Sequence, residues 1–422
     1  MNKLPLTQVR VIDLTMGIAG PTAAHILADL GAQVIKVEAP IRYDVTRMPG
    51  RDRTGLAVWA RELGRNKLAI ALDLTKPFGV DVFKRLVAKS DVVIESYTPR
   101  VMPQFGLDYE VLKKVNPKII MISMSGFGAT GPYRNYLGNG GVVYAASGLT
   151  ALSGYKDGPP IGMGGAYPDI ATGVNGALAV LAALYSRRRN EVGQHIDAPM
   201  REAMTQLVGV SLMEYMVNKR VIPRMGNDHP FIAPHGCYRC KGSDAWVTIA
   251  AASDEEWDRL VEVMGNPTWS QEDKFRDALS RWQHREQLDH LIEEWTKQHD
   301  RFEIQRKLQE VGVAAGAVLT AQDLINDEHL QQRGYFQVPD LASDTESSAE
   351  DDLFSREKNA PFSRQPWISS RFSWRTPSPS PSFAQHNDHV FREILGLSDE
   401  EVTKLYSEGV TSDAPGENTR KT

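Results

Sequence analysis

The chain has 422 residues, of which 41% are hydrophobic and 24% are charged, so it is long enough to build more than one core. Lysine and arginine total 48 against 53 acidic residues, and the formal charge of −5 leaves no basic field for nucleic acid or an anionic membrane. The only two cysteines, Cys237 and Cys240, exclude a disulfide framework, and we expect a multidomain cytoplasmic protein with a small-molecule or protein partner.

The first third of the chain alternates apolar β-branched runs with helical patterns, which is typical of βαβ units and a mainly parallel sheet. The expected strands cover residues 9–13, 33–38, 91–95 and 118–124. A helix over residues 20–31 joins the first two strands in a right-handed crossover. The turn before it holds two glycines but no GxGxxG, so a nicotinamide dehydrogenase has little support.

A short polar stretch, Arg65-Asn66-Lys67, precedes a strand-like run at residues 69–74. Its donors suit a phosphate or adenylate group. The same residues also suit a solvated turn, and the pattern does not decide between the two.

A second long helix is expected over residues 169–188, where small side chains permit close backbone approach and three arginines suit the C-terminal dipole. Its most apolar part, Ala177 to Tyr185, is about half of the ~20 residues that cross a bilayer. The N-terminus has no long apolar core followed by a cleavage site. We therefore expect neither a membrane span nor an export signal.

A smaller α+β domain is expected to begin after residue 224, with antiparallel strands at 236–239 and 245–250. Amphipathic helices follow at 254–264 and 283–312, with a linker near 320–336. The acidic, serine-rich segment 340–352 is expected to be a mobile loop. Helical order returns between residues 383 and 410, where Ser398 and the acidic residues after it mark a helix start.

Three residue types could carry chemistry. Asp169 stands near a helix N-terminus, where the dipole stabilises an ionised carboxylate that can act as a nucleophile, although aspartate there is often only an N-cap. Cys237 and Cys240 form a CxxC with no second pair or suitably spaced histidine, which favours packed cysteines and predicts no metal site. His235 could line a cleft or serve a backbone hydrogen bond.

Eight short segments in a fixed order carry a chain-wide resemblance. They are Val-Ile-Asp-Leu…Ala-Gly-Pro (11–21), Leu-Gly-Ala-Gln-Val-Ile-Lys-Val-Glu (30–38), Arg-Asn-Lys…Leu-Asp-Leu (65–74), Asp-Val-Val-Ile-Glu-Ser-Tyr (91–97), Gly-Phe-Gly-Ala-Thr-Gly-Pro-Tyr (126–133), Gly-Gln-His-Ile-Asp (193–197), Ala-Pro-His-Gly-Cys-Tyr (233–238) and Gly-Val-Ala-Ala-Gly-Ala-Val (312–318). Together they resemble the family III coenzyme A transferases, a family that also contains the α-methylacyl-CoA racemases.

The resemblance implies an α/β fold with a large Rossmann-like domain built from both chain ends, residues 1–224 and 331–422. A small α+β domain, residues 225–330, is inserted between them. It also implies an interlocked homodimer, with a heterodimer of paralogous subunits as the alternative. Acyl-CoA and a carboxylic acid would be the substrates, and no permanently bound cofactor is expected.

The resemblance implies that Asp169 is the catalytic aspartate. It assigns coenzyme A binding to four short stretches, mainly through backbone groups: Ile18 and Ala19; Leu72, Asp73, Leu74 and Thr75; Ser96, Tyr97 and Thr98; and Leu137, Gly138, Asn139 and Gly140. Arg100 is expected near the phosphates. An arginine that often follows the family's second strand is replaced here by Ala39-Pro40, which leaves Arg42 and Arg47 as candidates.

Transferase and racemase share the aspartate, but racemisation needs a second acid or base. The racemase branch has a histidine where this chain has Asn139, whose amide cannot exchange a proton near neutral pH. This favours transfer through an aspartyl anhydride and an aspartyl-CoA thioester. Backbone amides at 138–141 or 164–165 are candidates for the oxyanion site. A racemase, or a non-catalytic CoA-binding subunit of a heteromer, remain the alternatives.

The acceptor acid is the least defined part of the prediction. Formyl-CoA transferases carry consecutive glycines in a small-domain loop, where this chain has Gly226-Asn227-Asp228-His229-Pro230. This disfavours oxalate and favours a larger or dicarboxylic acid, such as succinate, malate or an aryl-substituted succinate, with succinyl-CoA as a candidate donor.

Overall fold

The structure is a computed structural model that describes residues 3–47, 56–164, 166–338 and 361–416. The chain divides into two compact units. The larger unit comprises Met1–Thr150, Gly162–Arg220 and Arg333–Thr422, and the smaller unit comprises Ala151–Ile161 and Val221–Gln332. Segment 151–161 thus groups with the smaller unit, although the sequence analysis assigned it to the large domain.

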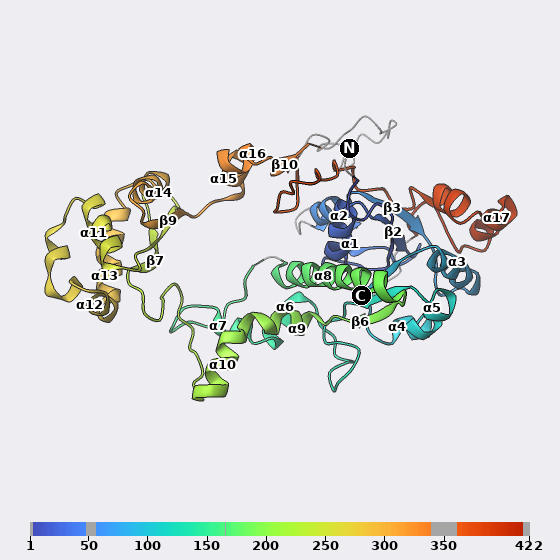
Figure 1. Cartoon of the computed structure of the whole chain (residues 1–422), viewed down its shortest axis with the longest axis horizontal. Helices are drawn as coiled ribbons and strands as arrows, with labels where there is room; N and C mark the ends of the chain where they lie inside the picture. The colour runs from blue at the N-terminus through green and yellow to red at the C-terminus, as the bar shows by residue number, and fades with distance from the viewer. Residues whose placement is uncertain (1–2, 48–55, 165, 339–360, 417–422) are drawn as a thin grey trace. The chain divides into compact units, whose positions relative to one another are not determined.

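A six-stranded parallel sheet forms the centre of the larger unit (Figure 1). Its strands, in spatial order, are β3 (Lys67–Ala71), β2 (Gln33–Glu38), β1 (Arg10–Asp13), β4 (Val92–Glu95), β5 (Ile120–Ser123) and β6 (Gln194–Asp197). The prediction of a parallel sheet is confirmed. The order reverses between β1 and β4, because the chain runs outward from β1 to β3 and then returns to the other side of β1.

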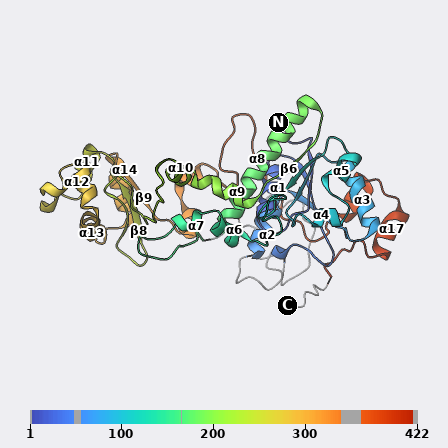
Figure 2. The same cartoon turned by 90° about the horizontal axis from the view of Figure 1, so that it is seen from below.

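Side-chain alternation along the strands supplies a buried face on each side of the sheet. Val11 packs with α1 (Ala19–Asp29) and α8 (Tyr167–Asn190) on one side. Ile12 packs on the other side with α3 (Pro77–Ala88), α5 (Tyr109–Val115) and the C-terminal segment, which holds the π-helical turn η6 (His389–Ile394) and α17 (Asp399–Ser407). Figure 2 shows this three-layer arrangement from below. The N-terminal and C-terminal parts of the chain therefore share one core.

The larger unit holds several further elements. They are η1 (Val45–Arg47), α2 (Leu56–Gly64), α4 (Val101–Gln104), α6 (Gly140–Ala146), α9 (Met200–Thr205), η3 (Gln206–Val208), α10 (Gly209–Asn218) and the short pair β10 (Phe336–Gln337) with β11 (Phe362–Ser363), and α7 (Leu149–Leu152) crosses the boundary between the units. The helix start expected at Ser398 is confirmed, since its side chain and that of Glu401 form a capping box on α17. The predicted loop 340–352 lies outside the described residues.

The smaller unit holds an antiparallel sheet of β7 (His235–Arg239), β8 (Trp246–Ala250) and β9 (Ala314–Ala317) with helices packed against it. Its helical elements are α11 (Asp254–Val263), η4 (Thr268–Gln271), η5 (Asp273–Phe275), α12 (Ala278–Gln283), α13 (Arg285–Thr296), α14 (Arg301–Glu310), α15 (Ala321–Asn326) and α16 (Glu328–Gln332). The single helix expected over 283–312 is wrong, because Asp300 accepts the amides of Phe302 and Glu303 and starts α14 anew. The linker expected near 320–336 is also wrong, since Thr320 and Asp323 form a capping box on α15.

Helix α8 crosses α1 at very short range. A Cβ added at Gly173 would lie 2.5 Å from Cβ of Thr22 and 2.7 Å from the carbonyl oxygen of Ala19. By length and apolar composition, α8 is the one helix of the described residues that could cross a bilayer. The run Ala177 to Tyr185 considered in the sequence therefore underestimates the apolar length of this helix. One face of α8 packs beside α1 in the core through Ala177, Val180 and Ala183. On the other face Val174, Leu178 and Tyr185 are more than half exposed.

This crossing predicts a stability effect. We expect Gly173→Ala to lower the free energy of unfolding by about 2 kcal/mol, because the added methyl overpacks a contact with backbone atoms. Gly209→Ala is the matched control, since Gly209 begins α10 and has no atom within 4 Å of an added Cβ. Urea denaturation of both variants measures the difference. Equal stabilities would contradict the close crossing.

Candidate active site

Two turns flank the point where the strand order reverses. Ligands of open parallel sheets bind at this crevice, beyond the carboxyl ends of the strands. After β1, Ile18 is the N-cap residue of α1 and Ala19 is its first residue. After β4, Ser96 turns toward the same place, and its hydroxyl accepts the amide of Met16 at 3.3 Å. Two of the predicted coenzyme A stretches are thus brought together by the topology.

The loop after β4 is held by a buried carboxyl group. Oε2 of Glu95 accepts the amide of Tyr97 at 2.8 Å, and burial raises the pKa of Glu95 to about 7. Burial likewise raises the pKa of the Tyr97 hydroxyl to about 12, so this phenol stays neutral. Thr98 precedes α4, and Arg100 is exposed at the N-cap of that helix.

The stretch Leu72 to Thr75 lies at the carboxyl end of the edge strand β3. Leu72, Asp73 and Leu74 are buried, and Thr75 is exposed. Oδ1 of Asp73 accepts both the amide of Thr75, at 2.9 Å, and its hydroxyl, at 2.6 Å, which fixes a tight turn before α3. The backbone of this turn is also tied to the C-terminal segment, because the amide of Asp73 donates to the carbonyl of Val410 at 2.8 Å.

Asp169 occupies the first turn of α8. The N-cap position belongs to Ala166, so the interpretation of Asp169 as only an N-cap is wrong: its carboxylate is the third residue of the helix. Gly173 is one turn further along the same face, where an added Cβ would lie 2.7 Å from the carbonyl oxygen of Ala19. This spacing directs Asp169 toward the start of α1.

The carboxylate of Asp169 lies against a glycine of another predicted stretch. A Cβ added at Gly140 would lie only 2.4 Å from Oδ2 of Asp169. Asn139 caps α6 here by accepting the amide of Val142 at 3.2 Å. Ala19 packs with Val143 of α6 in one small cluster. The first turn, the glycine stretch and the aspartate therefore meet at one place.

The surroundings of Asp169 change its acidity. Burial raises the pKa of the Asp169 carboxyl above its usual range, and the hydrogen bond from its own backbone amide offsets only part of that effect. A carboxylate with a raised pKa is more basic, and a partly desolvated one is also a stronger nucleophile.

This predicts a pH dependence. Only the ionised carboxylate can attack, so we expect kcat/KM for the acyl-CoA to fall as the pH drops through the pKa of Asp169, with the midpoint above the ordinary value of ~3.9. A pH–rate profile, with circular dichroism at each pH to confirm folding, measures it. A midpoint at or below the ordinary value would contradict the desolvated site.

Several other predicted residues are exposed or make contacts elsewhere. Leu137 is 76% exposed. Gly138 faces the ring of Phe127, because a Cβ added at Gly138 would lie 2.8 Å from Cε2 of Phe127. Gly164 is exposed, and residue 165 lies outside the described residues. Of the candidate arginines, Arg42 is exposed and Arg47 is bound to Glu38 at 2.9 Å.

The stretch Arg65-Asn66-Lys67 is neither a solvated turn nor a free set of donors. Arg65 and Asn66 bind Asp29, and Lys67 binds Asp13, all within 2.9 Å. All three side chains are buried. The polar pattern alone could not predict that these three side chains are buried, because their partner carboxylates come from α1 and β1.

The cysteine motif and the histidine belong to the smaller unit. Cys240 is buried in its core, and Cys237 is half-buried on β7. Nδ1 of His235 is 2.8 Å from the carbonyl oxygen of Asn227, so this histidine makes a backbone hydrogen bond. Among the residues that the structure describes, no cluster of histidine, cysteine or acidic side chains could hold a metal ion.

A set of buried charges that the sequence patterns did not predict lies beside the turn after β1. Lys36 lies between the apolar residues Ile35 and Val37 of β2 and binds Asp44, and Asp13 ends β1 and binds Lys67. The signal was present, because a charged residue flanked by buried apolar residues in a central strand needs a partner.

Comparison with known proteins agrees with this geometry. Residues 6–387 match the sequence model described as CoA-transferase family III. Succinyl-CoA–D-citramalate CoA-transferase of Chloroflexus aurantiacus is 34% identical over 408 residues, which cover 96% of this chain and 98% of that protein. The beta subunit of succinyl-CoA–L-malate CoA-transferase from the same organism is 31% identical over 411 residues, covering 96% and 98%. A crystal structure of a CaiB/BaiF family protein from Brucella suis superimposes with a TM-score of 0.83 at 32% identity, covering 94% of this chain and 100% of that one. The chain belongs to the CoA-transferase family III.

Proposed function

We propose that this family III CoA-transferase moves coenzyme A from succinyl-CoA to a dicarboxylic acid, with Asp169 as the acyl carrier. The observation that carries the proposal is the position of the Asp169 carboxylate, which lies against Gly140 and one helical turn from the contact with Ala19. A glycine at this place leaves the carboxylate open to a planar thioester, which a side chain would block.

The first half of the proposed reaction loads the aspartate. An oxygen of Asp169 attacks the thioester carbonyl carbon of the donor, the carbon–sulfur bond breaks, and a mixed anhydride and a coenzyme A thiolate result. The thiolate then attacks the aspartyl carbonyl of the anhydride. This step releases the donor acid as a carboxylate and leaves an aspartyl-CoA thioester.

The second half runs the same steps toward the acceptor. The acceptor carboxylate attacks the aspartyl thioester and forms a second anhydride with release of the thiolate. Attack of the thiolate on the acceptor carbonyl gives the new acyl-CoA and restores the Asp169 carboxylate. No proton is exchanged in the net reaction, so a single carboxylate suffices.

Each tetrahedral intermediate needs donors aimed at its oxyanion. The amides of Gly140 and Gly141 belong to the first turn of α6, where helix amides have no intrahelical acceptor. We assign the oxyanion site to this turn. Gly164, which is exposed before α8, is the second candidate.

Transfer is favoured over racemisation by the role of Asn139. Its side-chain oxygen accepts the amide of Val142 and caps α6, so it serves the backbone and carries no titratable proton. A racemase would need another acid or base facing the α-carbon.

The choice of acids rests on the relatives. The two named above act on succinyl-CoA with D-citramalate or L-malate, which are hydroxylated dicarboxylic acids. We extend this class of donor and acceptor to the present chain. The absence of consecutive glycines at residues 226–230 agrees with an acceptor larger than oxalate.

The experiment supplies purified protein with succinyl-CoA and a panel of acids that includes malate, citramalate, glutarate and oxalate, and follows the new CoA thioesters by mass spectrometry. We expect the fastest turnover with a four- or five-carbon dicarboxylic acid. Exchange of the α-proton of a branched acyl-CoA with deuterated solvent, without any acceptor, would instead establish a racemase. Binding of coenzyme A without any turnover would indicate a non-catalytic subunit.

We also propose that the chain works as an interlocked dimer. Helix α10 buries none of its side chains, and its apolar residues Val210, Met213 and Val217 are all more than half exposed. A face of this kind is typical of a protein interface. Sedimentation velocity should give twice the mass of one chain, and a heterodimer with a paralogous subunit would appear as a monomer of this chain alone.

A further inference from the structure

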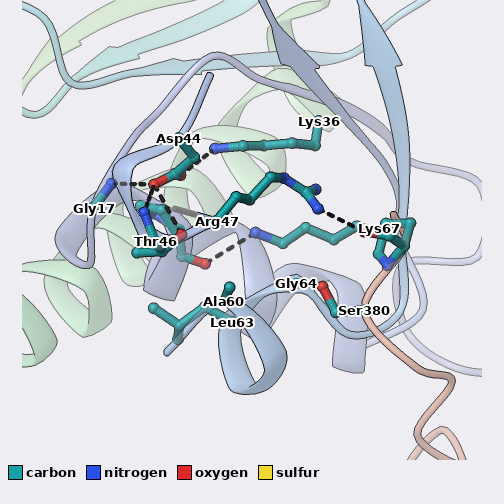
Figure 3. A pocket seen from close by; sticks show the side chains of 12 residues that line it. Gly17, Lys36, Asp44, Thr46, Arg47, Ala60, Leu63, Gly64, Lys67 and Ser380 are labelled. Atoms are coloured by element: carbon teal, nitrogen blue, oxygen red, sulfur yellow. Dashed lines mark hydrogen bonds and ion pairs between the residues drawn. The ribbon is translucent and has the colours of Figure 1, made fainter. Parts of the chain in front are cut away.

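Two charged side chains that the proposed reaction does not use are buried beside the turn after β1 (Figure 3). Nζ of Lys36 on β2 and Oδ2 of Asp44 are 2.9 Å apart, and the two side chains are only 8% and 5% exposed. Burying two charges costs several kcal/mol, which the pairing alone often does not recover. The other hydrogen bonds of Lys36 and Asp44 help to offset this cost, and they identify the part of the structure that the pair stabilises.

Each member of the pair also binds the backbone of the turn. Nζ of Lys36 donates to the carbonyl of Thr15, and Oδ1 of Asp44 accepts the amide of Gly17 at 3.2 Å. Gly17 has a φ of 76°, a left-handed conformation that glycine adopts without strain. The pair thus fixes the peptide groups on both sides of Met16, directly before Ile18.

Asp44 is itself held in place. Its Oδ1 accepts the amide of Thr46 at 3.0 Å and the hydroxyl of Thr46 at 2.9 Å, and its own amide donates to Glu38 at 2.9 Å. Burial alone would raise the pKa of Asp44, but the Lys36 ammonium and the amides of Thr46 and Gly17 outweigh it and lower that pKa. The carboxylate is therefore ionised at neutral pH, and its hydrogen bonds to Thr46 and Glu38 fix its position beside the turn.

The cavity beside the pair is small and balanced in charge. It offers about 30 Å³, which is enough for about two water molecules. Its cations are Lys36, Lys67 and Arg47, and each already binds a carboxylate. The backbone of the turn is therefore the partner that the pair serves.

We propose that Lys36 and Asp44 are positioning residues that hold the backbone at Ile18 and Ala19 in the conformation that binds coenzyme A. The inference rests on the proposed function, which assigns Ile18 and Ala19 to the coenzyme. Strands β1 and β2 are joined by their own backbone ladder. Weakening the pair should therefore loosen the turn more than the sheet.

The test is isothermal titration of the full-length protein with coenzyme A. We expect Asp44→Asn, which keeps the shape but removes the charge, to raise the Kd about tenfold, as loss of a charged hydrogen bond does. In steady state, KM for the acyl-CoA should rise while KM for the acceptor acid stays near the wild-type value. Thr46→Val is a milder variant that removes one bond to Asp44 and should raise the Kd about threefold.

Asp91→Asn is the matched control. Asp91 also pairs with an arginine, Arg187, at 2.7 Å, and also accepts a backbone amide, that of Arg10, at 2.8 Å. It lies just before β4, at the opposite end of the strands from the turn. We expect this variant to lose stability but to keep its affinity for coenzyme A.

The outcomes separate the inference from the proposed function. Wild-type affinity in Asp44→Asn, or an equal loss of affinity in Asp91→Asn, would overturn the positioning role while leaving the proposed function intact. Failure of the wild-type protein to bind coenzyme A would overturn both. Because binding is measured without turnover, neither result depends on the choice of acceptor acid.

Discussion

Replacement of Asp169 by asparagine should lower kcat for coenzyme A transfer by about 10⁴-fold or more, the scale on which enzymes lose activity with their nucleophile. The amide matches the carboxylate in shape but does not attack a thioester. Since Asp169 makes no N-cap bond in α8, the fold should be preserved. Steady-state transfer from succinyl-CoA, with binding of coenzyme A measured in parallel, gives the result.

Glu110→Gln is a suitable control for this variant. Glu110 is likewise an acidic residue in the first turn of a helix, α5, and it is exposed. Its replacement removes a favourable helix-dipole contact but should leave turnover unchanged. A comparable loss in both variants, or activity retained by Asp169→Asn, would rule out the nucleophile assignment.

Addition of one methyl group at Gly140 should reduce kcat about 10²-fold, since displacement of a reacting group by about 1 Å has this effect. The new Cβ would lie 2.4 Å from Oδ2 of Asp169, so the carboxylate must rotate away. Stability should be unchanged or slightly improved, because alanine favours a helix over glycine by about 1 kcal/mol. Transfer assays and thermal unfolding of Gly140→Ala measure the two effects.

Gly141→Ala separates this clash from a general effect on α6. The nearest atom to a Cβ at Gly141 is Oδ1 of Asn139 at 3.6 Å, which is an ordinary contact. Both variants add a methyl to the same first helical turn. Equal activities of the two would contradict the placement of Asp169 against Gly140.

Local sequence patterns predicted the elements of the larger unit well where the sheet buries both faces. Apolar β-branched runs marked β1, β2, β4 and β5, because such strands read as continuous hydrophobic segments. The patterns failed where single polar side chains determine the start of a helix. Asp300 divides the predicted helix 283–312, and Thr320 starts a helix in the predicted linker, since capping is set by single side chains.

The candidate site was only partly accessible to sequence reasoning. The small residues of α8 predicted a close helix crossing, and Gly173 provides it. The pattern around Asp169 could not distinguish a cap from a free carboxylate, because the N-cap differs from the third helical position only by a shift of the helix start. The contact with Gly140 joins residues 29 positions apart and depends on how α6 and α8 pack, which no local pattern contains.

The most direct test of the account traps the aspartyl intermediate. Wild-type protein is incubated with succinyl-CoA and treated with borohydride, which reduces an aspartyl thioester to an alcohol, and the peptides are mapped by mass spectrometry. The account predicts modification of Asp169 that requires succinyl-CoA and is absent from Asp169→Asn. Modification of a different residue, or an unmodified Asp169 in protein that turns over, would contradict it.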